Sequence, residues 1–232
     1  MKQYHWNRLL ILAIILLIFS CSLALAFNKP SEQESIIDLP KPRYDSDVSL
    51  EQSLIQRRSI RSYTSEPLTL LEVAQLLWAA QGVTDHRGFR TAPSAGALYP
   101  LELYVVAGDV QDLNPSVYRY KPDEHQLVRT VAGDKRAELA DAALGQHFIG
   151  EGAIVIVFTA VYERTTGKYG DRGIRYVHME VGHAAQNLCL QAAAMDLVAV
   201  TVGAFYDEEV SELLDLPGDE QPLYVIPVGR KQ

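Results

Sequence analysis

The region from residue 69 to residue 81 has the clearest helical pattern in the chain. Its apolar residues recur at i, i+3, i+4 and i+7, and they are Val73, Leu76, Leu77 and Ala80. This period places them on one face of an α-helix. Thr69 and Glu72 have the spacing of a capping box, which marks a helix start, and Gly82 stands where a helix commonly ends. The pattern predicts an amphipathic helix over 69–81.

The other apolar patterns predict a mixture of helices and strands. Ser49 and Gln52 repeat the capping-box spacing and predict a short helix that runs into Arg57. Further helices are expected after Asp134, over 173–197 and around Val210–Leu214. Strands are expected at 101–107, in a hairpin over 117–129, and at 153–160, 198–205 and 223–228. The run 153–160 is apolar throughout, which is typical of a strand buried on both faces. Without a regular βαβ repeat, this order predicts an α+β fold.

The first 26 residues have the composition of a targeting segment. Lys2 and Arg8 precede an unbroken apolar run over 9–19, and the small residues at 24–26 fit a signal-peptidase site. A cleaved signal peptide, an uncleaved membrane anchor and a lipoprotein modified at Cys21 all remain open. Each would leave the basic N-terminus in the cytoplasm and export the rest of the chain to the periplasm or cell envelope. A cytoplasmic protein would require this segment to be a misassigned start or a buried helix.

Composition sets broad limits on the remaining chain. The 232 residues are 48% hydrophobic and 22% charged, with a formal net charge of −8, as in an ordinary globular protein. The acidic balance argues against a broad nucleic-acid surface, which needs a basic face. We divide the chain into the segment 1–26, a proline-rich extended arm over 27–48 that packs little of its own, and a folded domain over 49–232.

Two chemistries are disfavoured by the placement of cysteine and histidine. Two cysteines allow at most one disulfide, which excludes a disulfide framework. Cys189 lies in an apolar helical stretch, so we expect a buried hydrophobe rather than a nucleophile. His178 and His183 are five residues apart and leave different faces of a helix, unlike a zinc-binding pair, and Glu180 between them is interpreted as a surface charge. We expect no metal site.

A basic cluster follows the first short helix. Arg57, Arg58, Ser59 and Arg61 place three guanidinium groups and a hydroxyl within five residues of an acidic protein. The planar guanidinium group suits phosphate oxygens, because it can donate two parallel hydrogen bonds. An exposed basic helix end is the alternative interpretation.

A second candidate feature is the segment 91–100, which is rich in small, hydroxylated and proline residues. Ser94, Ala95 and Gly96 would let the backbone approach a flat or anionic ligand closely. A plain turn is the alternative. The chain has neither the glycine fingerprint of a Rossmann fold nor the phosphate-binding motif of P-loop proteins.

Two further features contain glycines next to reactive or terminal residues. Over 167–173, a predicted loop, glycines flank Lys168 and Tyr169, which can donate or accept protons near a reacting centre. An exposed lysine and a packing tyrosine are the alternative. Glycines in the segment 201–205 and at Gly229-Arg230 indicate close backbone approach at strand ends.

Taken in order, four motifs resemble those of the nitroreductase-like flavoproteins, and in particular the SagB-type dehydrogenases. These are relatives of the azoline oxidases that build thiazole and oxazole peptides. The motifs are Arg57-Arg58-Ser59-x-Arg61, Pro93-Ser94-Ala95-Gly96-Ala97-Leu98-Tyr99-Pro100, Lys168-Tyr169-Gly170-x-Arg172-Gly173 and Gly182-His183-x-x-Gln186-Asn187. The similarity runs from about Leu39 to Arg230. It implies an α+β homodimer with a mixed sheet and flanking helices, FMN at the subunit interface, and ping-pong chemistry at the flavin N5.

The resemblance also implies roles for single residues. The residues implied in FMN binding are Arg57, Arg58, Ser59, Arg61, Pro93, Ser94, Ala95, Gly96, Gln186, Gly203, Ala204, Gly229 and Arg230. Among them the arginine cluster would hold the phosphate and ribityl chain, and Gly203 and Ala204 would offer backbone amides to the N5 edge. Lys168 and Tyr169 match the pair that azoline-oxidising relatives use for proton removal. Arg230 would replace basic residues that some relatives carry further downstream.

These features together predict an FMN-dependent oxidoreductase. If the domain is exported, we expect it to oxidise a small-molecule or peptide substrate, because a recycled NAD(P)H pool is not expected outside the cytoplasm. Two alternatives remain: an NAD(P)H-dependent nitro or quinone reductase, and a non-catalytic flavin-binding module of the envelope.

Overall fold

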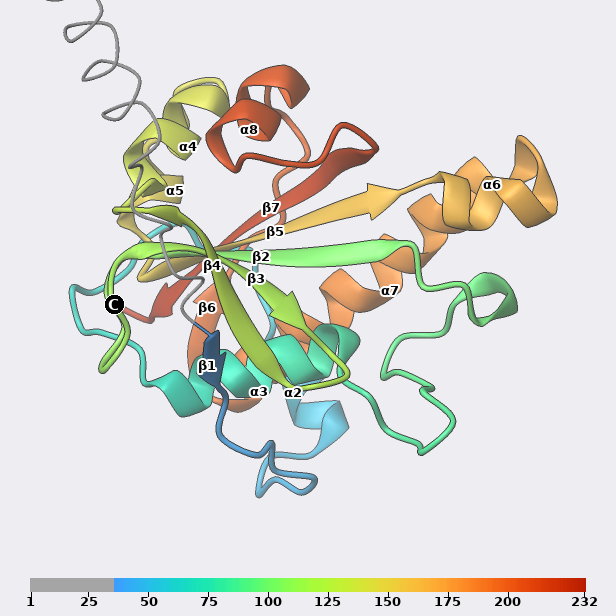
Figure 1. The fold of residues 1–232 in the computed structure, drawn as a ribbon. Helices are drawn as coiled ribbons and strands as arrows, with labels where there is room; N and C mark the ends of the chain where they lie inside the picture. The colour runs from blue at the N-terminus through green and yellow to red at the C-terminus, as the bar shows by residue number, and fades with distance from the viewer. Residues whose placement is uncertain (1–35) are drawn as a thin grey trace, which may run out of the picture. The chain divides into compact units, whose positions relative to one another are not determined.

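A seven-stranded sheet runs through the part of the chain that the computed structural model describes, residues 36–232 (Figure 1). Its order is β1-β4-β3-β2-β5-β7-β6. The strands are β1 (Ile36–Asp38), β2 (Leu101–Ala107), β3 (Ser116–Lys121), β4 (Gln126–Ala132), β5 (Ile154–Val161), β6 (Leu197–Ala199) and β7 (Glu220–Arg230). Every neighbouring pair is antiparallel. The predicted α+β class is confirmed, but the sheet is antiparallel rather than mixed. Parallel pairing among these residues is limited to isolated bridges at Ser59–Ala199 and Leu68–Val110.

The predicted targeting segment 1–26 and the start of the arm lie outside the described residues. From residue 36 onward, no helix combines the length and apolar character that a membrane span needs. The described chain ends at Gln232.

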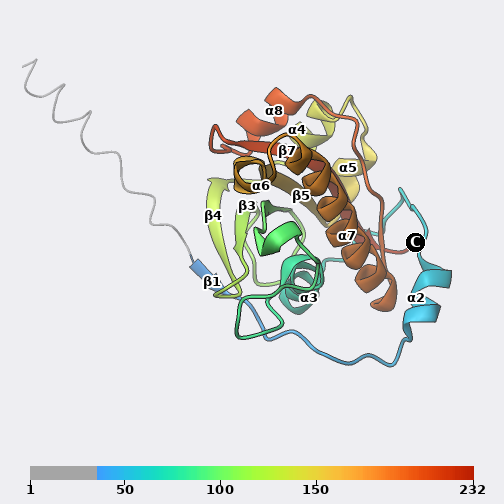
Figure 2. The same ribbon diagram turned by 90° about the vertical axis from the view of Figure 1, so that its right-hand side faces the viewer.

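Helices cover both faces of the sheet (Figures 1 and 2). The helices are α2 (Leu50–Gln56), α3 (Leu70–Gln81), α4 (Arg136–Ala142), α5 (Phe148–Glu151), α6 (Glu163–Tyr169), α7 (Arg172–Ala194) and α8 (Asp207–Leu213), with a 3₁₀ turn at Ala95–Ala97. Buried residues of α3 and α7 form one apolar core with Leu103 and Val105. Those of α4, α5 and α8 form a second core with Tyr104 and Val106. Successive side chains of β2 thus point into opposite cores, as the alternation of side chains along a strand requires.

Strand β5 lies between these two cores. All eight of its residues are buried. Ile156 and Phe158 join the core under α3 and α7, whereas Val155 and Val157 join the other. This double burial accounts for the continuous apolar run in the sequence, although both neighbours of β5 are antiparallel.

Both predicted capping boxes are present. The amide of Gln52 donates to Ser49 Oγ at 3.2 Å and the amide of Ser49 to Gln52 Oε1 at 3.2 Å. At the start of α3, the amide of Thr69 donates to Glu72 Oε2 at 2.8 Å and that of Glu72 to Thr69 Oγ1 at 3.2 Å. These reciprocal bonds satisfy amides that the first turn leaves unpaired.

Two predicted boundaries were wrong in the C-terminal half. The strand expected over 198–205 is only β6, after which Val202 makes a single bridge to Val225 and the chain leaves the sheet. The loop expected over 167–173 is instead the end of α6 and the start of α7. Gly170, with a φ of +57°, makes the corner between these helices, a backbone conformation that glycine adopts without strain.

The described part of the arm is bound to the chain's own domain. β1 pairs with the outer edge of β4, and Leu39 is buried in the core under α3. Further along, the Gln75 side chain accepts from the amide of Arg43 at 2.8 Å and donates to its carbonyl at 3.1 Å. The arm therefore closes one edge of the sheet and crosses α3.

A substitution at Leu39 measures how much the arm contributes to the free energy of unfolding. Leu39→Ala should lower the free energy of unfolding by about 2–3 kcal/mol, because it removes a buried side chain and leaves a cavity. Ile36→Ala, also in the arm but at a side chain that is 59% exposed, should change it by less than about 0.5 kcal/mol. Chemical denaturation of both variants tests this. Equal losses would show that Leu39 has no special packing role.

Candidate functional site

The loop over 93–100 lies against the end of α6 and brings two of the predicted features together. A Cβ at Gly96 would stand 2.8 Å from Tyr169 Oη and 3.0 Å from Lys168 Nζ. Gly96 also has a φ of +65°, a left-handed conformation that favours glycine. The Gly96 loop and the Lys168–Tyr169 pair form what we call the α6 half-site.

The backbone of this loop is unusually constrained. Ala97 and Tyr99, neither of them glycine, have φ values of 53° and 45°. Such residues persist only where surrounding contacts hold them. Here the amide of Tyr99 donates to Ser94 Oγ at 2.9 Å, and the amide of Arg90 donates to Tyr99 Oη at 3.2 Å. The loop is thus fixed in a conformation that a plain turn would not need.

Lys168 and Tyr169 occupy the last turn of α6. The Lys168 ammonium lies 5.4 Å from the centroid of the Tyr169 ring, and Tyr169 packs edge-on against Tyr176 with ring centroids 5.2 Å apart. Lys168 is exposed and Tyr169 half-buried. At the following corner, a Cβ on Gly173 would stand 2.8 Å from the Thr166 amide nitrogen. The glycines of this motif therefore allow α6 and α7 to meet closely.

A buried carboxylate lies beneath the loop. Glu180 of α7 is 2% exposed, and its Oε1 has no hydrogen-bond partner among the described residues. Burial raises the pKa of Glu180 to about 7, although the Ser94 hydroxyl and the Arg90 guanidinium oppose that shift. The prediction of a surface charge at this position was wrong. Val177, Glu180 and Ala184 share the buried face of α7, so helical periodicity could have placed Glu180 inside.

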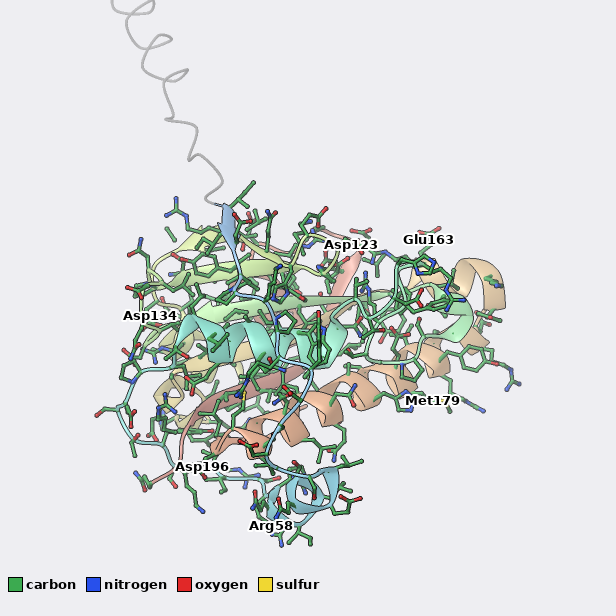
Figure 3. The ribbon with its side chains drawn as sticks, turned by 90° about the horizontal axis from the view of Figure 1, so that it is seen from below. Arg58, Asp123, Asp134, Glu163, Met179 and Asp196 are labelled. Atoms are coloured by element: carbon green, nitrogen blue, oxygen red, sulfur yellow. The ribbon has the colours of Figure 1, made fainter. Side chains whose placement is uncertain are left out.

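The basic cluster lies at the other end of α7, next to β6. The amide of Ile60 donates to the carbonyl of Ala199 at 3.3 Å and thereby attaches the cluster to the sheet edge. A cavity of about 300 Å³ opens there, and its lining includes Arg57, Arg58, Cys189, Asp196 and Lys231. We call this the arginine half-site. Figure 3 shows Arg58 and Asp196 near one end of α7 and Glu163 near the other.

The arginines of this half-site differ in their surroundings. Arg58 donates to the carbonyls of Ile55 and Arg57 at 2.8 and 2.7 Å, so its guanidinium caps the end of α2. Arg61 lies 5.5 Å from the ring centroid of Phe148 and faces α5. Arg57 lines the cavity together with Lys231, a cation that the sequence motifs did not single out.

Gly203 and Ala204 follow closely after β6 and are exposed. Neither backbone amide donates to another group within residues 36–232, and the carbonyl of Ala204 accepts from Gln146 Nε2 at 3.0 Å. The two residues do not line the cavity of the arginine half-site, and a Cβ at Gly203 would lie 3.6 Å from the Tyr224 ring. Their free amides fit the predicted role of donors to a ligand.

Gly229 and Arg230 contact other residues of the domain: Gly229 lies against the Tyr63 ring, and Arg230 pairs with two carboxylates. A Cβ at Gly229 would stand 2.7 Å from the Tyr63 ring, which explains the glycine. The Arg230 guanidinium pairs with Glu72 at 3.0 and 3.1 Å and with Glu66 at 3.1 Å. These two carboxylates occupy Arg230, so Lys231 is the cation near the chain end that faces the cavity.

The two half-sites do not meet within one chain. About 25 Å of helix separates Arg172 from Cys189 at the usual rise of 1.5 Å per residue. Gln186 lies between these ends, exposed on the solvent face of α7. Cys189 itself is a buried free cysteine, and burial raises its pKa to about 11. Such a thiol is unreactive, as predicted.

Comparison with known proteins identifies the fold. The sequence profile of the nitroreductase family matches residues 54–230. The chain belongs to the nitroreductase family. A protein of Methanocaldococcus jannaschii named as a candidate nitroreductase is 55% identical over 185 residues, which cover 80% of this chain and 92% of that protein. The crystal structure of a candidate nitroreductase from Ralstonia eutropha is 31% identical with a TM-score of 0.76, covering 87% of this chain and 92% of that one. Nitroreductases are generally flavin oxidoreductases.

A more distant relative is named as a microcin-processing protein. The microcin B17-processing protein McbC of Escherichia coli is 29% identical over 133 residues, which cover 55% of this chain and 48% of that protein. The structure of the microcin synthetase McbBCD complex shares the fold of this nitroreductase, with 23% identity and a TM-score of 0.68 over 90% of this chain and 82% of that one.

The buried Glu180 predicts a pH-dependent stability. Its pKa is about 7 in the folded protein, against 4.5 for an unperturbed glutamate, so the folded state holds the proton more tightly. Stability should therefore fall as pH rises from 4.5 to 7, by roughly 3 kcal/mol at 1.36 kcal/mol per pKa unit. Glu180→Gln should lack this fall. Denaturation at several pH values measures the difference between the two proteins, and parallel curves would contradict the assignment.

Proposed function

We propose that this nitroreductase is an FMN-dependent dehydrogenase of the SagB type that oxidises a peptide or small-molecule substrate. The observation that carries the proposal is the approach of Gly96 to Tyr169 Oη and Lys168 Nζ. An exposed glycine beside an amine and a phenol suits a ligand that is held close to the backbone and a proton transfer. The motifs that resemble the SagB-type enzymes include both elements of this half-site.

The arginine half-site fits the phosphate of FMN. Arg57, Arg58 and Lys231 face one cavity with Asp196 as its acidic member, and guanidinium groups form strong charge-assisted bonds to phosphate. The free amides of Gly203 and Ala204 would bind the edge of the ring. When bound, FMN supplies the hydride acceptor of the reaction.

A second copy of the chain would complete the site. The two half-sites lie at opposite ends of α7, so one flavin held at the arginine half-site of one chain would need the Gly96 loop from another. Exposed apolar side chains on α2 and α7 offer a surface for such a partner, namely Leu50, Leu54, Ile55, Ile174 and Met179. We therefore propose a homodimer.

Lys168 and Tyr169 would take the proton that leaves the substrate. Dehydrogenation removes a hydride from one substrate atom and a proton from its neighbour. The acceptor beside the loop would be the unprotonated amine of Lys168 or the phenolate of Tyr169. The two electrons would pass on to oxygen, a quinone or an envelope redox partner, in keeping with the proposed export of the domain.

One observation favours a second candidate, an NAD(P)H-dependent nitro or quinone reductase. The M. jannaschii relative, 55% identical, is named as a candidate nitroreductase. This reaction would use the same flavin site but would not require Lys168 for proton removal, so the two candidates differ in their dependence on that residue.

The first prediction from this proposal is that protein without residues 1–26 purifies as a yellow dimer with FMN bound. Arg57→Ala should weaken FMN binding roughly 10- to 100-fold, because one charge-assisted bond contributes about 1.5–3 kcal/mol. Arg87→Ala serves as a control, since it breaks an exposed pair with Asp85 and Arg87 does not line the cavity of the arginine half-site. Flavin titration and light scattering measure the two properties. A colourless protein that takes up no FMN, or a monomer that retains it, would refute the proposal.

The second prediction concerns Lys168 and Tyr169. Lys168→Ala and Tyr169→Phe should slow the reduction of bound flavin by a thiazoline-containing peptide about 10²–10⁴-fold while leaving FMN content unchanged, because each removes a proton acceptor. Anaerobic stopped-flow absorbance measures the rate. Rapid reduction by NADH or NADPH that survives both substitutions, with no reaction of the peptide, would favour the reductase instead.

A further inference from the structure

Arg164 connects the two elements of the α6 half-site. It lies one helical turn before Lys168 in α6. Its guanidinium donates to the carbonyl of Tyr99 at 3.1 Å and to Glu102 Oε1 at 2.6 Å. Tyr99 ends the constrained loop, and Glu102 belongs to β2. One side chain therefore holds the helix that carries Lys168, the loop that carries Gly96, and the sheet.

The acceptor on the sheet is itself fixed. Glu102 has a side chain only 12% exposed, and it also pairs with Arg119 of β3 at 3.1 Å. Arg119 reaches the buried Glu220 of β7 at 3.3 Å. Glu220 in turn accepts from Tyr104 Oη at 3.0 Å and Thr159 Oγ1 at 2.9 Å. Charges of alternating sign thus run from Arg164 through β2 and β3 to β7, and this network gives α6 a rigid point of attachment.

Helix α6 packs against α7 through Tyr169 and Tyr176, whereas Arg164 attaches it to the loop and to the sheet. It has seven residues, of which only Thr165 is buried, and helices this short are marginal without tertiary contacts. Nothing lies within 4 Å of a Cβ placed at Gly167 or Gly170. The loop opposite contains left-handed Ala97 and Tyr99, a conformation that requires external support.

We propose that Arg164 is a positioning residue that sets the placement of Lys168 and Tyr169 against the Gly96 loop. This rests on the proposed function for its catalytic consequence. Arg164 is itself 38% exposed in its side chain, and exposed ion pairs add little to stability. Its effect should therefore appear in the geometry of the site rather than in the melting temperature.

Arg164→Ala and Arg164→Lys test this, both alone and in a Lys168→Ala, Tyr169→Phe background. Arg164→Ala should keep its FMN and its melting temperature but lose kcat about 10- to 100-fold, since small misplacements of reacting groups cost that much. The KM for the thiazoline peptide should not change. In the background without Lys168 and Tyr169, the same substitution should have no further effect. Arg164→Lys should recover part of kcat, because lysine keeps one of the two bonds.

Hydrogen exchange provides a readout that needs no substrate. In Arg164→Ala, the amides of residues 93–100 and 162–171 should exchange faster while the rest of the chain is unchanged, and Arg87→Ala should alter neither segment. If Lys168→Ala and Tyr169→Phe leave the rate intact, the proposed function fails and hydrogen exchange alone decides the role of Arg164. Unchanged exchange in Arg164→Ala, or an equal loss of kcat in both backgrounds, would overturn the proposal.

Discussion

The packing of α7 against the sheet and α3 controls where a binding site can form in this molecule. Val177, Ala184 and Leu188 face the core, whereas Gly182 and Gln186 face solvent. A helix packed along its length behaves as a stiff rod, because interior side chains are close-packed. It holds the α6 half-site at one end and the arginine half-site at the other, and neither can reach the other by local motion. A flavin site that uses both halves therefore depends on the association of two chains.

The two half-sites are built by different physical means. At the α6 half-site the backbone is confined by hydrogen bonds to Tyr99, and the position of the reactive groups is set by contact. At the arginine half-site the groups are cations around an open cavity, and recognition would depend on charge. The first arrangement fixes the positions of the reactive groups to within a short distance of each other, which a proton transfer requires. The second tolerates side-chain movement, because electrostatic attraction falls slowly with distance.

Features governed by local sequence could be predicted, whereas those that depend on distant partners could not. Each capping box, at Ser49 and at Thr69, depends only on residues within one stretch of four, and both are present. Arg230, in contrast, pairs with Glu72, which is 158 residues away. The sequence around either residue does not indicate that the two side chains meet. The strand expected over 198–205 has enough apolar residues for a strand, and β7 continues past Val228 to Glu220. The chain nevertheless leaves β7 after Ala199 and returns only for the bridge between Val202 and Val225, a path that the local sequence does not specify.

The two outermost strands of the sheet are much shorter than its central strands. β1 and β6, the outermost strands of the described sheet, have three residues each, while the central strands β2 and β5 have seven and eight. Unpaired backbone groups on a long edge strand can recruit strands from other molecules and lead to aggregation. β1 pairs with Gln126, Leu127 and Val128 of β4, and β6 with Val228, Gly229 and Arg230 of β7, so each short strand adds few open groups of its own. The arm that supplies β1 therefore has a second value: it covers part of the edge of β4 and limits the sheet's capacity to extend there from one molecule into the next.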